Sequence, residues 1–234
     1  MIGYYICIGL VLFTIIIAGA AQARVNSAYS AHKKTPSSLN MTGRDLVYAM
    51  SRHSHIALKI KSSKGQLSDH YDPRDKSINI SEENMNSNSV SALAVVAHEF
   101  GHALQDEESY APYKIRQISV KVSNFMSAML VPMLLIGILL EMFWLVGVGE
   151  IFIYCVVGVY FLSFVVSLIT IPVEYNASSR AKKLLVEMGA NGEGEMRATS
   201  EVLNAAAMTY VASMLVNLVY LLRWIYILGI FRRD

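Results

Sequence analysis

The sequence has 234 residues, of which 54% are hydrophobic and only 16% are charged. Because soluble domains average about 25% charged residues, this composition excludes an ordinary soluble domain and indicates a membrane protein. The net charge of +2 is too small to favour nucleic-acid binding, and the two cysteines lie in apolar runs, which excludes a disulfide framework or a cysteine metal cluster.

The first apolar stretch runs from about Gly3 to Ala21 and carries no charge. Its length approaches the 20 or so residues with which a helix crosses a bilayer. The AQA at 21–23 resembles a signal-peptide cleavage site, but no lysine or arginine precedes the stretch, as one does in most signal peptides. We therefore predict a retained transmembrane helix over residues 1–22, with removal of this segment as the alternative.

Residues 23–121 have an ordinary polar composition and are expected to form a small α+β lobe. A helix is predicted near Thr42, whose hydroxyl can cap the first turn while the acid three residues on completes a capping box. The alternating sequence IALKI at 56–60 predicts a strand, and two further short strands should form a hairpin around the DPRD turn at 72–75.

The next predicted helix runs from about Val90 to Asp106, is capped by Ser89 or a neighbouring polar residue, and contains the sequence HEFGH. Residues four apart lie on one face of a helix, so the imidazoles of His98 and His102 converge. Two histidines and a third protein ligand, with water in the fourth position, are typical of a catalytic zinc site.

The residues between and beside the two histidines fit the same chemistry. Glu99 is placed to take a proton from a zinc-bound water, whose pKa the metal lowers to about 7. Gly101 would let another backbone approach the helix closely. Two histidines hold zinc weakly on their own, so a third ligand is needed.

Two apolar stretches in the segment 122–171 predict a transmembrane hairpin connected at VGVGE (146–150), and a fourth span follows within 205–234. With four spans, the loops 23–121 and 172–204 must lie on the same side of the membrane. Seventeen of the 20 lysines and arginines lie in these loops, so the positive-inside rule predicts that both are cytoplasmic.

The third ligand should be a carboxylate on this same side, because no histidine follows His102. Asp106, Glu107 and Glu108 lie too near the motif. Glu174 is the strongest candidate, since it follows the third span directly, where Pro172 can start a new helix. The alternative is that Glu174 only complements the dipole at a helix N-terminus. The remaining candidate carboxylates lie further along the loop 172–204: Glu187, Glu193, Glu195 and Glu201.

Four motifs, in order, resemble a known family: LSDHYDP (67–73), HEFGHALQ (98–105), PVEYNASSRA (172–181) and AAAMTYVA (205–212). They are similar to the bacterial membrane-embedded neutral zinc metallopeptidases of the YugP type, over most of the chain from about residue 40. The resemblance implies that His98, His102 and Glu174 are zinc ligands and that Glu99 is the catalytic base. It also implies a zincin-like lobe inserted between the first and second of four transmembrane helices.

The order of HExxH and a later glutamate is also similar to HtpX heat-shock proteases and CAAX prenyl proteases. Those usually carry an aspartate one turn after the ligand glutamate, where this chain has Ser178. The task of orienting a ligand histidine should therefore pass to Ser178, Asn176 or another group. The strand around His70 could lie beside the site as an edge that accepts an extended peptide.

We therefore predict a mainly α bacterial membrane protein that uses Zn²⁺ to hydrolyse peptides or membrane proteins near the cytoplasmic face of the bilayer. The alternative is a non-catalytic membrane scaffold, in which a structural zinc ion joins the lobe to the later helices. His70 is interpreted as a surface histidine rather than an oxyanion stabiliser.

Overall fold

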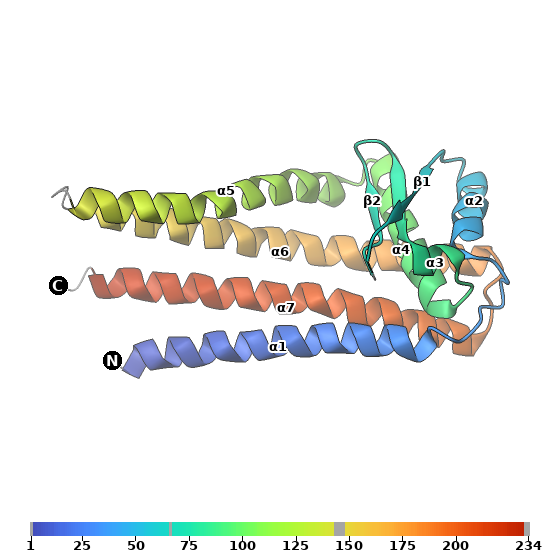
Figure 1. The fold of residues 1–234 in the computed structure, drawn as a ribbon, viewed down its shortest axis with the longest axis horizontal. Coiled ribbons are helices and arrows are strands. Elements are labelled where there is room, and N and C mark those ends of the chain that lie inside the picture. Colours follow the sequence, from blue (N-terminus) through green and yellow to red (C-terminus); the bar gives the residue numbers. More distant parts are fainter. Residues whose placement is uncertain (1, 66, 143–147, 232–234) are drawn as a thin grey trace. The chain divides into compact units, whose positions relative to one another are not determined.

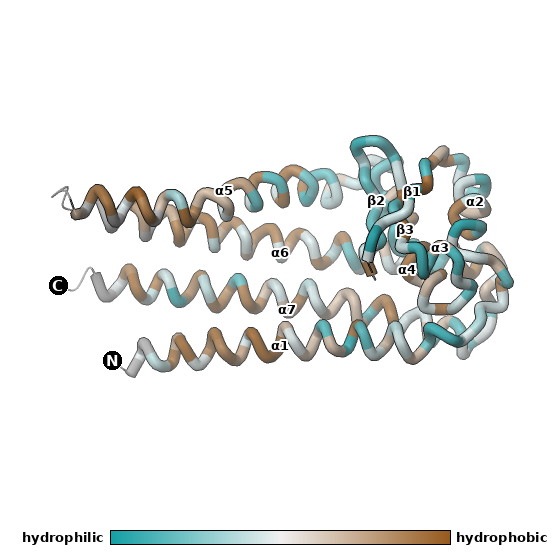
Figure 2. The backbone as a smooth tube through the Cα atoms, viewed as in Figure 1, coloured by the Kyte–Doolittle hydropathy of each residue, from teal (hydrophilic) through white to brown (hydrophobic). Residues whose placement is uncertain are grey.

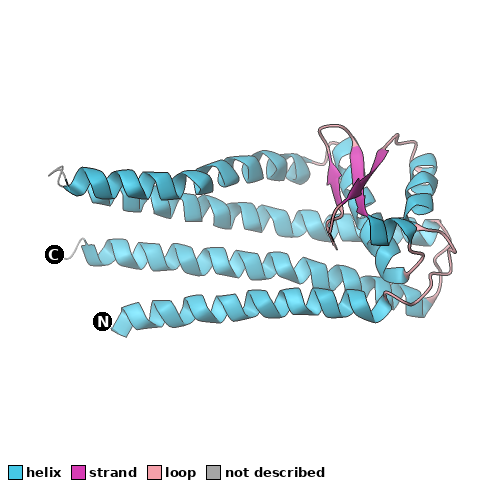
Figure 3. Cartoon of the chain, in the orientation of Figure 1, coloured by secondary structure: helices cyan, strands magenta, loops and turns pink. Residues whose placement is uncertain are grey.

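The computed structural model describes residues 2–65, 67–142 and 148–231, and within them the chain is mainly helical (Figure 1). The described elements are seven helices and three strands. The four long helices are α1 (Ile2–His32), α5 (Ala111–Met142), α6 (Val148–Glu187) and α7 (Glu193–Phe231). The three strands, magenta in Figure 3, and three shorter helices all fall between α1 and α5 in the sequence.

Each long helix contains a stretch that is long and apolar enough to cross a membrane, which confirms the prediction of four candidate spans. Apolar residues predominate along the first part of α1, whereas polar residues predominate in and around the strands (Figure 2). The predicted connection at 146–150 begins within residues 143–147, which lie outside the described residues.

The prediction that Pro172 starts a new helix is wrong, because α6 continues through it without a break. Proline removes one backbone hydrogen-bond donor, and a long helix can tolerate that loss when its neighbours pack well. The segment that carries Glu174 is therefore the continuation of the predicted third span.

The chain divides into two compact units, which are described separately. The helical unit comprises Met1–Ala20, Ile115–Ile171 and Tyr210–Asp234. The mixed unit comprises Ala21–Lys114 and Pro172–Thr209, and it contains all three strands.

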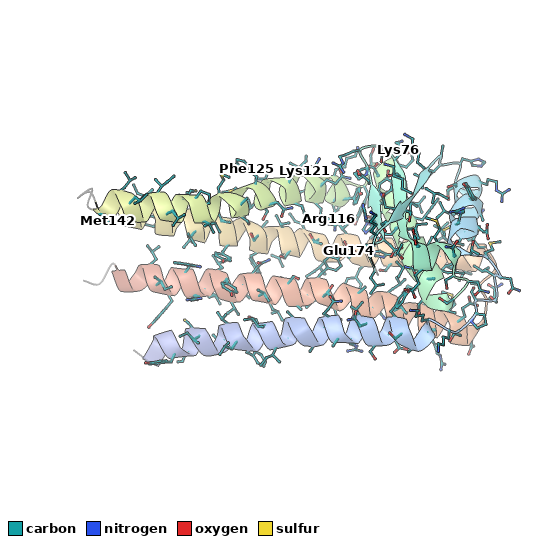
Figure 4. All side chains as sticks on the ribbon, in the orientation of Figure 1. Lys76, Arg116, Lys121, Phe125, Met142 and Glu174 are labelled. Carbon is teal, nitrogen blue, oxygen red and sulfur yellow. The ribbon has the colours of Figure 1, made fainter. Side chains whose placement is uncertain are left out.

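Polar side chains of the helical unit bond to one another between helices. Ser123 of α5 lies 3.1 Å from Ser163 of α6, oxygen to oxygen, and the Asn217 amide of α7 donates to Ser167 of α6 at 2.7 Å. Such bonds between neutral groups are typical of packed transmembrane helices. Apolar side chains such as Phe125 and Met142 project outward from α5 (Figure 4) and are 66% and 70% exposed, as expected for a lipid-facing surface.

In the mixed unit, α2 (Gly43–His53) begins as the sequence predicted. Thr42 is its N-cap, and the side chain and backbone of Thr42 and Asp45 form a reciprocal capping box. The apolar face of α2, made of Leu46, Val47 and Met50, is fully buried.

The three strands form one sheet in the order β1-β3-β2. β2 (His70–Asp72) and β3 (Ser77–Ser81) pair antiparallel, which confirms the predicted hairpin around the DPRD turn. β1 (Lys59–Ser63) begins three residues later than predicted and pairs parallel to β3. Since β3 lies in the middle, β1 and β2 are the two edges of the sheet.

A second short helix, α3 (Glu82–Asn86), occupies the polar run before α4 (Val90–Glu107). Ser89 caps α4, as predicted, by accepting a hydrogen bond from the backbone of Ala92. The inner face of α4 packs into one hydrophobic core with α2 and the sheet, and residues of α6 and α7 join that core. Most of α4 is therefore buried, although the helix carries two histidines and a glutamate, residue types that are fully buried less often than apolar ones.

Candidate metal centre

α4 carries His98 and His102 on one face, as their spacing of four residues requires. Their ring centroids lie 4.8 Å apart and the ring planes are nearly perpendicular, at 83°. The ring of Tyr113 stacks on that of His102, with centroids 5.7 Å apart. Packing therefore fixes both imidazoles before any ligand arrives.

Glu174 of α6 completes a three-residue group. Its Oε2 lies 3.1 Å from Nε2 of His98 and 3.5 Å from Nε2 of His102. The side chain of Glu174 (labelled in Figure 4) is 1% exposed, and the donor atoms of the three residues all lie within 4.8 Å of one another. The structure thus brings together the three residues that the sequence had proposed as metal ligands.

The donor set fits zinc. Two imidazole nitrogens and one carboxylate oxygen form a common ligand set for catalytic zinc, with bonds of about 2.0–2.1 Å. In a tetrahedron with such bonds, neighbouring donor atoms lie about 3.3 Å apart. The two separations measured from Glu174, 3.1 and 3.5 Å, bracket that distance.

Close packing of α4 on α6 makes this convergence possible. A Cβ atom at Gly101 would lie 2.5 Å from the backbone oxygen of Ala177, which is far inside van der Waals contact. The two backbones meet here because Gly101 has no side chain, in agreement with the role that the sequence suggested for it.

Each histidine has a hydrogen-bond partner on its other ring nitrogen. Nδ1 of His98 lies 3.1 Å from Oγ of Ser178, and Nδ1 of His102 lies 2.9 Å from Oε1 of Gln105. Such partners fix the orientation of a ligand imidazole and leave Nε2 toward the metal position. Ser178 is one of the residues that the sequence proposed for this task, whereas Gln105 was missed.

Gln105 could have been found from its position. It follows His102 by three residues and so lies on the same face of α4, where a fully buried amide must satisfy its hydrogen bonds. Asn176, the other residue proposed to orient a histidine, contacts Gln105 rather than a ring nitrogen.

Glu99 lies beside His98 and is held by the sheet. Its Oε2 accepts a hydrogen bond of 2.9 Å from the backbone amide of Tyr71 in β2. Desolvation is the largest influence on this carboxyl and raises its pKa to about 7, against an opposing influence of His98. A carboxyl with a pKa near neutrality is suited to both accepting and donating a proton.

The chain matches the family described as "Putative neutral zinc metallopeptidase" over residues 6–229. It is also 38% identical over 208 residues to "Putative membrane protease YugP" of Bacillus subtilis (strain 168), which covers 88% of this chain and 89% of that protein. The chain belongs to this zinc metallopeptidase family. A comparison with solved structures gives no significant match.

Most of the other carboxylates that the sequence offered as a third ligand bond to partners other than His98 and His102. Asp106 accepts from the hydroxyl of Tyr71, Glu107 pairs with Lys76, and Glu108 pairs with Arg180. Further along the chain, Glu187 pairs with His53, Glu195 with Ser37 and Ser38, and Glu201 with His32. Glu174 is the carboxylate that meets both histidines.

β2 lies beside the site, but its side chains have ordinary partners. His70 is exposed and its Nδ1 lies 2.9 Å from the backbone oxygen of Ser68, which fits the interpretation as a surface histidine. Asp69 accepts from Ser81 and Asn84 and so ties the strand to α3. Since the Tyr71 amide on the outer edge already binds Glu99, that amide is occupied for any peptide that approaches there.

Proposed function

We propose that this chain is an integral-membrane zinc metallopeptidase that hydrolyses peptide bonds near the membrane surface. The observation that carries the proposal is the convergence of His98, His102 and Glu174, in which the Glu174 carboxylate lies 3.1 and 3.5 Å from the two imidazole nitrogens, distances that suit tetrahedral zinc. Membership of the zinc metallopeptidase family supports the same reaction class.

In this proposal Nε2 of His98, Nε2 of His102 and a carboxylate oxygen of Glu174 would hold the zinc ion. Bound zinc supplies a Lewis acid for the scissile carbonyl and lowers the pKa of a water molecule to about 7. Glu99 takes the proton of the attacking water and then passes it to the leaving amine. Because the Tyr71 amide occupies Oε2, we assign this proton transfer to Oε1 of Glu99.

The placement of the chain in the membrane is part of the proposal. We propose a bacterial cell-membrane protein with four spans and a zincin-like lobe between the first and second. The concentration of lysine and arginine in residues 23–121 and 172–204 supports a cytoplasmic location for that lobe. A site tethered there would act on membrane proteins, or on peptides that reach the bilayer surface.

The scaffold alternative differs from the enzyme in what Glu99 does. A structural zinc ion needs no base, whereas zinc hydrolysis does. The pKa of Glu99, which burial raises to about 7, favours the enzyme, because a structural site gains nothing from this carboxyl.

The test compares wild type, Glu99→Gln and Glu174→Ala in detergent or nanodiscs. Zinc content is measured by elemental analysis, and hydrolysis by release of a fluorophore from a quenched peptide. The enzyme requires that Glu99→Gln keep its zinc and lose hydrolysis by roughly 10²–10⁴-fold. A wild type that binds zinc and is no faster than Glu99→Gln would establish the scaffold instead.

A further inference from the structure

The hydrogen bonds around Gln105 can run in only one direction. Its Nε2 lies 2.8 Å from the backbone oxygen of Val173, and a carbonyl oxygen can only accept. The amide nitrogen must therefore point at Val173, and the amide oxygen must point at His102. Since that oxygen can only accept, Nδ1 of His102 carries the proton and Nε2 is left free for a metal.

Asn176 supports this direction from the other side. Its Oδ1 accepts from Nε2 of Gln105 at 2.9 Å and also from Nε of Arg180 at 2.7 Å. A guanidinium group has donors and no acceptor, so it holds the oxygen of Asn176, and not the nitrogen, toward Gln105. Arg180 thus sets the orientation of one amide, which in turn sets the orientation of the next.

Arg180 is itself held in place. Its Nη1 lies 2.7 Å from Oε1 of Glu108, and its guanidinium carbon lies 5.9 Å from the centre of the Tyr110 ring. The ion pair and the aromatic contact restrain a side chain that would otherwise sample many rotamers. The series of bonds therefore begins at a partly exposed ion pair and ends at a ring nitrogen of His102.

We propose that Asn176 and Arg180 are positioning residues that keep His102 in the tautomer able to bind zinc. The proposal rests on the proposed function, since it assumes that His102 is a zinc ligand. If the amide of Gln105 turned over, its NH₂ group would face Nδ1 and favour a proton on Nε2, where the metal bonds. The carbonyl of Val173 opposes that turn by itself, so loss of Asn176 weakens the site without abolishing it.

The experiment compares Asn176→Leu with Asn176→Asp in the full-length protein. Leucine removes the acceptor, whereas aspartate still accepts from both Gln105 and Arg180. Glu187→Gln is the matched control, because Glu187 lies on the same helix and in an ion pair but outside this series of bonds. Zinc affinity is measured by competition with a chromogenic chelator, and the geometry of the site by the visible absorption of the cobalt-substituted protein.

We expect Asn176→Leu to weaken zinc binding about 10–100-fold and to alter the cobalt spectrum, as loss of such a partner does in other zinc sites. The zinc affinities of Asn176→Asp and Glu187→Gln should stay within about threefold of the wild-type value, a change much smaller than that expected for Asn176→Leu. Arg180→Met provides a second variant if leucine prevents folding, and it should weaken zinc binding in the same direction. Wild-type zinc affinity and cobalt spectrum in Asn176→Leu, or in Arg180→Met where leucine prevents folding, would overturn the proposal.

The readouts separate this inference from the proposed function. A wild type that binds zinc but hydrolyses nothing contradicts the peptidase, while the affinity comparison still decides the role of Asn176. A wild type that binds no zinc contradicts both.

Discussion

The two units of this protein bury polar groups in different ways. In the helical unit, half-buried neutral groups bond to one another, namely the hydroxyls of Ser163 and Ser167 and the amide of Asn217. In the mixed unit, Glu174 is buried at 1% exposure between two histidines. Neutral groups can be paired within an apolar setting at small cost, whereas a buried carboxylate costs several kcal/mol unless cations or strong donors compensate it. The contrast indicates that the first cluster serves packing and that the second is built to receive a cation.

Removal of zinc should give the largest effect and should be confined to one unit. Chelation is expected to abolish hydrolysis and to lower the free energy of unfolding of the mixed unit. If the concentration of free zinc before chelation is 1,000 times its dissociation constant, the loss should be about 4 kcal/mol. Hydrogen exchange followed by mass spectrometry should show faster exchange in α4 and little change in α5. Equal changes in both helices would remove the distinction between the units.

A glycine in each unit offers a matched pair of substitutions. Gly101→Ala places a Cβ against the backbone oxygen of Ala177 and should destabilise the mixed unit by about 1–3 kcal/mol, with weaker zinc binding. Gly158→Ala in α6 meets nothing within 4 Å and should be neutral, or stabilising by up to about 1 kcal/mol. Thermal unfolding and zinc titration measure both. Equal tolerance at the two positions would mean that α4 and α6 are not in close contact.

The stability of the metal-free protein should depend on pH through Glu99. Its pKa in the folded protein, about 7, lies above the ordinary 4.5, so between these values the folded state holds a proton that the unfolded chain releases. The free energy of unfolding should therefore fall as pH rises from 4.5 to 7. Urea denaturation of metal-free wild type and Glu99→Gln checks this, since the variant should lack this part of the slope. Identical slopes would show that Glu99 titrates normally.

The smallest effect is expected in the helical unit. Asn217→Leu removes the amide that donates to Ser167 and should cost about 0.6 kcal/mol, a typical value for a hydrogen bond between transmembrane helices. Unfolding in mixed detergent measures the loss, and zinc affinity should be unchanged. A large loss of zinc binding would give this cluster a role beyond packing.

The parts of the site that the sequence predicted are those governed by local rules. The four-residue spacing of His98 and His102, the capping of α2 and α4, and the hairpin around the DPRD turn follow from short-range geometry. Glu174 was found because the number of membrane spans limits which carboxylates share a side with the histidines.

The parts that were missed depend on tertiary contacts. The parallel pairing of β1 with β3 joins strands that a hairpin rule does not connect, so β1 was placed three residues early. Helix α6 passes through Pro172 because the surrounding packing outweighs one lost backbone bond. Gln105 was missed because its partners, Val173 and Asn176, are about seventy residues away in the chain.

X-ray absorption at the zinc edge tests the central claim most directly, because it identifies the atoms bound to the metal. For the wild type we predict only nitrogen and oxygen neighbours at about 2.0–2.1 Å, with the multiple-scattering signature of two imidazoles. Glu174→Ala should keep the two imidazoles and lose the carboxylate oxygen. Sulfur neighbours at about 2.3 Å, or an unchanged spectrum in Glu174→Ala, would contradict a site made by His98, His102 and Glu174.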